Sequence, residues 1–495
     1  MAPLEWFHRY RPEPTEGGLV SAVKDVLLGR LPAAAPGGRD PCPPLLKVAI
    51  TRELLHASLR EAVGPVFAPT SETVLKRVIS TWWEQGLQEA LELAASLEGE
   101  APALGWLARG LLKVGRAVSR VRGALHPHLL VAGEGLAATV SETRDWVCGP
   151  VRGLAWHPHC TKLAVATVDD AVRIYSSDLS FVPVLKLRTQ RSVSCMQWRP
   201  FSASELAVGC ERGVYVWSLD PTSVATRPSA SCATFLRHPD SCPVTGLAWS
   251  PQGDVLLTCS PASTTMFAWD VERRQFSAVR RRVGGGGVCL VSWSPDSCRV
   301  FSASTSVVFR VWETALWTDE VWKAVSGRVR SACWSPCGSV LLFATSDDPK
   351  IFSLTYGAAA GCGEEARSAT SVLPVIDLTL AETEQGVRVG GIVSSMQWDA
   401  RGHFLAVLFL DSPLIAVFST CVLPTRLHVS PCCLINGIRG EIPNVMSFQK
   451  NFEEGSLLTV AWSSGRVQQF PFLYVNYPAN TSGHYQMPGA ASPCD

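Results

Sequence analysis

The sequence predicts an all-β fold, a seven-bladed β-propeller of the WD40 type, preceded by a short α-helical region and a disordered leader. Three observations predict it: a frame of eight residues recurs along the chain, its period suits a four-stranded blade, and two further apolar strands follow each copy. Five copies match closely, a sixth lacks the final proline, and a weaker seventh has Phe in place of Trp. The copies are Val151–Pro158, Val193–Pro200, Val244–Pro251, Val288–Pro295, Val329–Pro336, Val393–Ala400 and a stretch around Phe448.

One aromatic residue of each copy is expected to anchor its blade in the core. Successive anchors are 42, 51, 44, 41, 64 and 50 residues apart. An apolar residue two positions earlier shares the anchor's face of the strand, and the residue three positions earlier, on the other face, is mostly small. Such a strand can pack its bulky face on one sheet while another sheet approaches its slim face. The predicted structural anchors are Trp156, Trp198, Trp249, Trp293, Trp334, Trp398 and Phe448.

Each unit continues past its anchor with a turn and two apolar strands, and a looser fourth strand follows in the connector. In two copies the turn reads Ser-Pro-x-Gly (250–253 and 335–338) and in a third Ser-Pro-Asp-Ser (294–297), which suits a type I turn. One unit cannot bury both faces, so the copies are expected to stack into a ring. We expect seven blades, with six or eight as alternatives. The residues before Val151 are expected to supply a closing strand for the last blade, and 372–380 the outer strand within the longest connector.

The composition narrows the classes of function. The chain has 495 residues, 44 of them basic and 43 acidic, with a formal net charge of +1, so direct binding of nucleic acid is not expected. No apolar run reaches the roughly 18 residues of a membrane span, and the N-terminus lacks the apolar core of a signal peptide. The 17 cysteines include no Cys-x-x-Cys pair. We therefore expect reduced thiols in a soluble, intracellular protein without a transmembrane segment.

Four regions are expected along the chain: a disordered leader (1–45), a helical region (46–135), the propeller (136–475) and a flexible tail (476–495). The leader is rich in Pro, Gly and Ala, a composition that cannot bury enough apolar surface to fold. Within the helical region, the stretch 71–97 lacks proline and is rich in helix formers.

The stretch 104–123 is expected to form the most strongly amphipathic helix of the chain. Its apolar face consists of Leu104, Leu107, Leu111, Val114, Val118 and Val121, and its basic face of Arg109, Lys113, Arg116 and Arg120. These four basic residues are a candidate contact with a partner protein or with an anionic membrane surface. The alternative is a helix that packs on the propeller and turns its basic face to water.

Candidate chemistry is sparse. His157, His159 and Cys160 carry metal-ligating atoms, but they follow the first anchor on a turn and have no partner cluster. The run Gly284–Gly287 is not followed by Gly-Lys-Ser/Thr, which favours a flexible connector over a phosphate-binding loop. We therefore expect no catalytic residue, no cofactor and no metal, and hence no enzyme.

Several stretches resemble the aladin family of WD-repeat nucleoporins, in their connectors as well as in their blades. They are 156–175 (WHPHCTKLAVATVDDAVRIY), 219–229 (LDPTSVATRPS), 238–251 (HPDSCPVTGLAWSP), 307–317 (VVFRVWETALW), 455–475 (GSLLTVAWSSGRVQQFPFLYV) and, upstream, 74–91 (VLKRVISTWWEQGLQEAL). The leader differs from that of the family, and the tail is shorter than its Pro-rich counterpart. Among the predicted third strands, only the one ending in Trp269-Asp270 keeps the literal Trp-Asp pair.

This resemblance implies a propeller at the nuclear pore complex of the nuclear envelope. Its implied partners are other nucleoporins, among them a transmembrane nucleoporin that holds it at the pore membrane. The resemblance also implies links to import cargo, to nucleocytoplasmic transport of proteins and mRNA, and to spindle proteins at the spindle poles in mitosis. The family offers no catalytic residues.

Three functions follow in order. The first is a non-enzymatic scaffold or adaptor subunit of the nuclear pore complex. The alternative is a WD-repeat substrate adaptor of a ubiquitin ligase, which uses the same fold. That class often carries Trp-Asp-x-Arg, whereas Arg273 here comes one residue late after Trp269-Asp270. The third is a propeller enzyme, which would need convergent acid, base or metal-binding side chains at the central channel.

Overall fold

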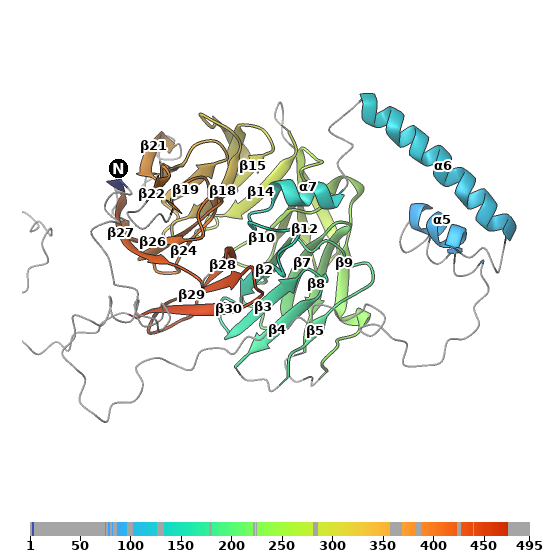
Figure 1. Ribbon diagram of the computed structural model, residues 1–495, viewed down its shortest axis with the longest axis horizontal. Helices are drawn as coiled ribbons and strands as arrows, with labels where there is room; N and C mark the ends of the chain where they lie inside the picture. Colours follow the sequence, from blue (N-terminus) through green and yellow to red (C-terminus); the bar gives the residue numbers. More distant parts are fainter. Residues whose placement is uncertain are drawn as a thin grey trace, which may run out of the picture.

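The computed structural model describes most of the chain from residue 133 onward and two helices before it. The described residues are 2–3, 75, 78–79, 82, 87–96, 102–125 and 133–473, apart from the short gaps 178–180, 221–222, 224, 281–285, 357–368, 383–387, 423–426 and 439. Between residues 151 and 473 the chain forms seven blades, each an antiparallel sheet of three or four strands, arranged as a ring (Figure 1). The predicted seven-bladed β-propeller is therefore confirmed.

Each blade is a run of consecutive strands that pair in chain order. The first four blades are β2 (Val151–Trp156), β3 (Lys162–Thr167), β4 (Val172–Ser176) and β5 (Val184–Leu185); β6 (Cys195–Trp198), β7 (Glu205–Cys210), β8 (Gly213–Ser218) and β9 (Ala233–Leu236); β10 (Gly246–Trp249), β11 (Leu256–Cys259), β12 (Thr265–Asp270) and β13 (Gln275–Arg280); and β14 (Val288–Trp293), β15 (Arg299–Ser304), β16 (Val308–Glu313) and β17 (Thr318–Lys323). The last three blades are β18 (Val329–Trp334), β19 (Val340–Thr345), β20 (Lys350–Tyr356) and β21 (Ala369–Asp377); β24 (Val393–Trp398), β25 (Phe404–Phe409), β26 (Ile415–Val422) and β27 (Leu427–Ile435); and β28 (Pro443–Gln449), β29 (Gly455–Trp462) and β30 (Val467–Leu473).

Short elements lie between and beside the blades. Two 3₁₀ turns, η3 (Ala230–Cys232) and η4 (Pro239–Ser241), flank β9, and a small pair, β22 (Ala381–Glu382) with β23 (Arg388–Val389), lies between the fifth and sixth blades. Strand β21 covers the stretch expected as an outer strand. Of the predicted leader only β1 (Ala2–Pro3) is described, and it pairs in parallel with β21.

The first strand of every blade lines the centre of the ring. These strands contact one another in the order β2, β6, β10, β14, β18, β24 and β28, and β28 returns to β2. The small residues of the repeated frame make this approach possible. A Cβ added at Gly246 would lie 2.8 Å from Cys259 Sγ and 3.4 Å from the carbonyl oxygen of Cys289 in the next blade. Glycine at this position therefore lets neighbouring blades pack closely.

The anchor residues join each blade to its neighbour. The indole Nε1 of Trp198 donates to the carbonyl of Ala155, that of Trp293 to Ala248, and that of Trp334 to Ser292, at 3.0, 3.2 and 3.3 Å. Each acceptor directly precedes the anchor of the preceding blade. Trp156 closes the ring, because its Nε1 donates to Thr459 Oγ1 in the last blade at 3.0 Å.

The remaining three anchors differ in their polar contacts. The backbone N–H groups of Trp249 and Phe448 donate to the side chains of Gln197 and Gln397, again from the preceding blade. Trp398 instead donates to Thr420 within its own blade, at 2.8 Å. Trp293 and Trp398 are partly buried, and the other five anchors are buried.

The residue after the anchor organises the turn that follows. Its side-chain oxygen accepts the backbone N–H five residues later: Val255 donates to Ser250, Arg299 to Ser294, and Val340 to Ser335, at 2.8–3.1 Å. In the copy without proline, Asp399 takes this role and accepts from Phe404 at 2.8 Å. The missing proline therefore leaves the turn intact.

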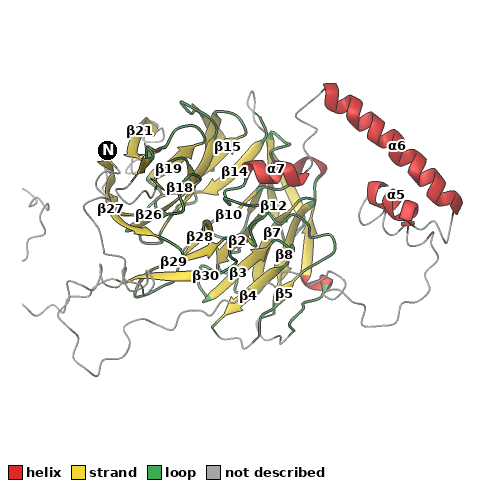
Figure 2. Ribbon diagram, viewed as in Figure 1, coloured by secondary structure: helices red, strands yellow, loops and turns green. Residues whose placement is uncertain are grey.

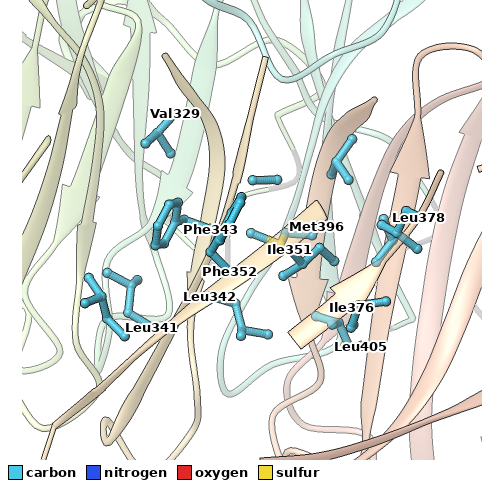
Figure 3. Packing of buried hydrophobic residues seen from close by; sticks show 14 of the residues in the cluster. Val329, Leu341, Leu342, Phe343, Ile351, Phe352, Ile376, Leu378, Met396 and Leu405 are labelled. Atoms are coloured by element: carbon cyan, nitrogen blue, oxygen red, sulfur yellow. The ribbon is translucent and has the colours of Figure 1, made fainter. Parts of the chain in front are cut away.

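The core is a set of apolar layers between adjacent blades. In the largest layer, side chains of β19 and β20 such as Phe343 and Phe352 pack beside Ile376 of β21 and Met396 and Leu405 of the next blade (Figure 3). The Phe343 and Phe352 rings stack at 5.5 Å. Burial of this kind stabilises the folded state by roughly 25 cal/mol for each Å² of apolar surface removed from water.

One expectation about the ring is wrong. The residues before β2 do not add a strand to the last blade, whose described part has the three strands β28, β29 and β30. They form the helix α7 (Gly133–Val140) and a run of turns instead (Figure 2). The physical reason is that Ala137 and Val140 lie on one face of a helix and are both buried. This segment therefore packs on the ring as a helix and does not pair as a strand at its edge.

Two further helices precede the propeller. α5 (Leu87–Ser96) covers part of the predicted 71–97 helix, and α6 (Pro102–Leu125) contains the whole predicted 104–123 helix. α5 packs along α6. In Figure 1 this pair lies to one side of the ring, so α6 does not pack on the propeller as the alternative interpretation expected.

Candidate interaction surfaces

Residues 133–150, here called the cap segment, lie across one mouth of the central channel. Arg328 Nη2, from the connector between the fourth and fifth blades, donates to the carbonyl of Thr139 at 2.6 Å. Ser394 Oγ of β24 donates to the carbonyl of Glu142 at 3.0 Å. Asn444 of β28 accepts the N–H of Asp145 at 2.8 Å. Because these partners come from different blades, only a segment at the mouth of the ring can reach them all.

A buried arginine fixes the cap segment to the first blade. Arg152 of β2 is 5% exposed, and its guanidinium lies 4.1 Å from the centre of the Trp146 ring. It donates to Asp170 Oδ1 at 2.8 Å and to the carbonyl of Trp146 at 3.2 Å. A weaker ion pair at 3.5 Å reaches Glu134 of α7. Arg152 of β2 therefore links the helix α7 and the turn at Trp146 to the first blade.

Glu142 of the cap segment has an unusual carboxyl group. Part of the residue remains exposed, but its carboxyl is surrounded by protein. Burial raises the pKa of the Glu142 carboxyl to about 7, against the opposing effects of a hydrogen bond with Ser331 and the charge of Arg330. This group can therefore change its charge near neutral pH.

The two faces of the ring differ in exposed apolar surface. We call the face that holds the cap segment the cap face and the other the opposite face; turns within a blade alternate between them. Among the described residues, the large exposed apolar side chains of the cap face are Val147, Val307, Val325, Leu380, Ile438 and Ile442. On the opposite face they are Val182, Phe201 and Leu316. Exposed apolar groups are typical of protein-binding surfaces, so the cap face is the stronger candidate.

The predicted basic residues all lie on α6. The side chains of Arg109 and Lys113 are exposed, and Arg109 Nε donates to the carbonyl of Gly105 at 3.2 Å. Arg116 and Arg120 belong to the same helix, but their side chains lie outside the described residues. Arg109 and Lys113 lie one turn apart on this helix, in the part of the chain before the propeller.

The apolar side of α6 is largely uncovered. Ala108 packs against α5 and is buried, whereas Trp106, Leu107, Leu111 and Val114 are exposed. Between α5, α6 and residues 78–82 lies a shallow apolar groove of about 260 Å³, lined in part by Trp82, Leu107 and Leu111. This surface was not recognised from the sequence, because the hydrophobic pattern is the same for a buried face and an exposed one.

The candidate metal-ligating residues serve a turn. His157 replaces the serine that follows the anchor in other blades, and its Nδ1 accepts the N–H groups of His159 and Cys160 at 3.0 and 2.9 Å. Its Nε2 therefore donates to the carbonyl of Ser202, 2.8 Å away. Within the described part of the chain, no three His, Cys, Asp or Glu side chains group closely enough to hold a metal ion.

The thiols of the described cysteines are free, and several lie on inner strands. Burial raises the pKa of the Cys195 thiol to about 12 and that of Cys289 to about 11. Such thiols stay protonated at neutral pH, which makes them poor nucleophiles. No helix among the described residues combines the length and the apolar character that crossing a membrane requires.

Most residues of the cap contacts could not be identified from the sequence. Asn444 and Asp145 are 299 positions apart, and no local sequence pattern predicts a contact between residues so distant in the chain. The local signal that the sequence offers for α7 is the short run 133–140, where Ala137 and Val140 recur at helical spacing.

Comparisons with known proteins agree with this architecture. The family model described as the Aladin seven-bladed propeller matches residues 132–473. Aladin of Arabidopsis thaliana is 29% identical over 355 residues, which cover 66% of this chain and 76% of that protein. Cilia- and flagella-associated protein 44 of Mus musculus is 30% identical over 164 residues, 30% of this chain and 9% of that protein.

Among solved structures, a chain in the crystal structure of the mitotic checkpoint complex matches with 15% identity and a TM-score of 0.48, over 64% of this chain and 86% of that one. The family match runs from the cap segment to the end of β30 and so includes every blade. The chain therefore belongs to the aladin family of seven-bladed propellers.

Proposed function

We propose that this propeller, of the nucleoporin type that the aladin family represents, is a non-enzymatic scaffold or adaptor subunit of the nuclear pore complex. The observation that carries the proposal is the family match across the entire ring, cap segment included. A transmembrane nucleoporin would hold it at the pore membrane, and other nucleoporins, import cargo and spindle proteins are its further candidate partners. In this role it would support nucleocytoplasmic transport of proteins and mRNA at the nuclear envelope, and act at spindle poles in mitosis.

The geometry supports a binding role for the cap face in particular. One channel mouth, where many propellers place a ligand site, is covered here by α7 and the turns after it. Partners would then meet the surface around the cap. Val325 and Val307 lie on neighbouring loops there, joined by a 2.8 Å hydrogen bond from Ala324 to Val307. Exposed apolar residues on a rigid rim suit a stable protein partner.

The test is the location of a full-length fluorescent fusion in living cells. A punctate nuclear rim is expected for the unaltered chain. Two matched variants then separate the faces: V325D/I438D changes the cap face, and F201D/L316D changes the opposite face. All four side chains are exposed, so both variants should fold.

We expect V325D/I438D to lose most of the rim signal and F201D/L316D to keep it. The reverse result would move the partner surface to the opposite face. A diffuse cytoplasmic signal for the unaltered chain would contradict the pore proposal and favour a soluble adaptor, such as one for a ubiquitin ligase.

A further inference from the structure

The helix α6 combines an exposed apolar surface with an excess of positive charge. Its 24 residues include five basic side chains and no acidic one. Of the large apolar side chains that the structure shows as exposed, seven of twenty belong either to α6 or to Leu75, Ile79 and Trp82 before α5. A surface this apolar is unfavourable in water unless something covers it.

The exposed apolar side chains spread along the surface of α6 rather than gathering in one pocket. Leu107 and Leu111 line the groove with Trp82, whereas Trp106, 72% exposed, and Val114 lie outside it. A Cβ added at Gly110, which lies between Trp106 and Val114 around the helix, would meet no atom within 4 Å, so this side of the helix is open. An extended apolar layer, such as the acyl region of a bilayer, can contact all of these side chains, whereas one side chain of a partner protein could fill only the groove.

The charged side chains lie on one flank of Trp106, away from the exposed leucines. At 100° per residue, Lys113 stands next to Trp106 and Arg109 lies further round, nearly opposite Leu111, and α5 covers the side that carries Ala108. A helix that rests in a lipid interface needs this arrangement: apolar groups that enter the acyl boundary, Trp at headgroup level, and basic side chains that reach anionic headgroups.

We propose that α6 binds the surface of an anionic lipid bilayer, lying parallel to it along about 36 Å of helix. Charge complementarity favours this occupant over an apolar protein groove, because each basic residue near an anionic membrane strengthens binding by about fivefold. The inference does not depend on the proposed pore role, since it concerns the helix pair alone and can be tested without a pore.

The experiment is flotation of the full-length protein with vesicles of phosphatidylcholine alone or of phosphatidylcholine with added phosphatidylserine, an anionic lipid of cytoplasmic leaflets. Two variants change α6: R109E/K113E reverses the flank, and W106S/V114S removes apolar groups. Two propeller variants match them: R273E/R274E makes the same change in net charge, and L316S removes an exposed leucine with the same 72% exposure as Trp106.

We expect binding to the anionic vesicles that weakens with salt, falls roughly 25-fold or more in R109E/K113E, and falls clearly in W106S/V114S. The propeller variants should bind as the unaltered chain does. The thermal transition of each variant serves as the check on folding.

Three results would overturn the proposal. One is no binding by a folded chain. Another is binding that the propeller variants weaken and the α6 variants do not. The third is equally strong binding to vesicles of phosphatidylcholine alone, which would show that the anionic headgroups play no part. A negative vesicle result would leave the rim signal of the fusion protein unchanged, so the two proposals can fail separately.

Discussion

Strand β25 and helix α6 contain similar apolar residues and place them in opposite environments. All six side chains of β25 (Phe404–Phe409) are buried between neighbouring strands and blades. On α6, Leu107, Leu111 and Val114 are exposed, and only the side toward α5 is covered. A central strand of a ring has neighbours on both faces, whereas a pair of helices has one partner each. The number of available neighbours, and not the hydrophobic pattern, decides whether an apolar side chain is buried.

The largest test of this comparison replaces one tryptophan in each region by alanine. Trp198 is 2% exposed and bonded to the preceding blade, so W198A should lower the free energy of unfolding by about 3–5 kcal/mol. W106A on α6 should lower it by less than about 0.5 kcal/mol. Denaturant unfolding followed by circular dichroism measures both. A similar loss in the two variants would mean that α6 is part of the same cooperative core.

The sequence reveals the ring because its signal is repeated. Seven anchors, each with an apolar residue two positions earlier and most with a small residue three positions earlier, specify strands whose faces must both be covered. The inner strands lie where the frame placed them. The bonds from Trp198, Trp293 and Trp334 to the preceding blade follow from this same repetition.

Features that occur once could not be predicted in this way. The cap segment is held by hydrogen bonds with Asn444, Ser394 and Arg328. These residues come from different blades, so the bonds can form only when the ring has formed. For α6, the sequence specified the two faces of the helix but not which of them a neighbour would cover. A pattern identifies an amphipathic helix, whereas burial depends on the rest of the molecule.

A second test asks whether the cap segment belongs to the ring or opens like a separate unit. R152M keeps the contact with Trp146 but removes the bonds to Asp170 and to the Trp146 carbonyl. We expect a loss of about 2 kcal/mol, because Asp170 keeps some access to water and breaking a fully buried pair costs more. Hydrogen exchange at the amides of 141–150 should become faster before that of the blades. An equal change in every blade would show that the cap segment unfolds only with the ring.

The third test uses the raised pKa of Glu142. Its folded-state pKa of about 7 lies above the unfolded value of about 4.5, so the native state binds the proton more tightly. Its contribution to stability is therefore full below pH 4.5 and is lost as the pH rises to 7. E142Q should remove this dependence and make the protein about 1–2 kcal/mol more stable at pH 8, relative to pH 5, than the unaltered chain. E454Q, at an exposed position, is the control, and an equal pH profile in both variants would contradict the assignment.

The smallest expected change in stability is the most informative test of the difference between β25 and α6. W106S/V114S removes two large apolar side chains from α6, yet it should leave the unfolding of the propeller unchanged within about 0.5 kcal/mol. Tryptophan, valine and serine have similar helix propensities, so the helix itself should persist. The same pair of changes at buried strand positions would unfold a blade. If scanning calorimetry instead shows that the variant loses several degrees, α6 stabilises the ring directly, and its apolar surface would be a docking face within the chain. If the transition stays in place while vesicle binding falls, the exposed residues serve a surface outside the protein.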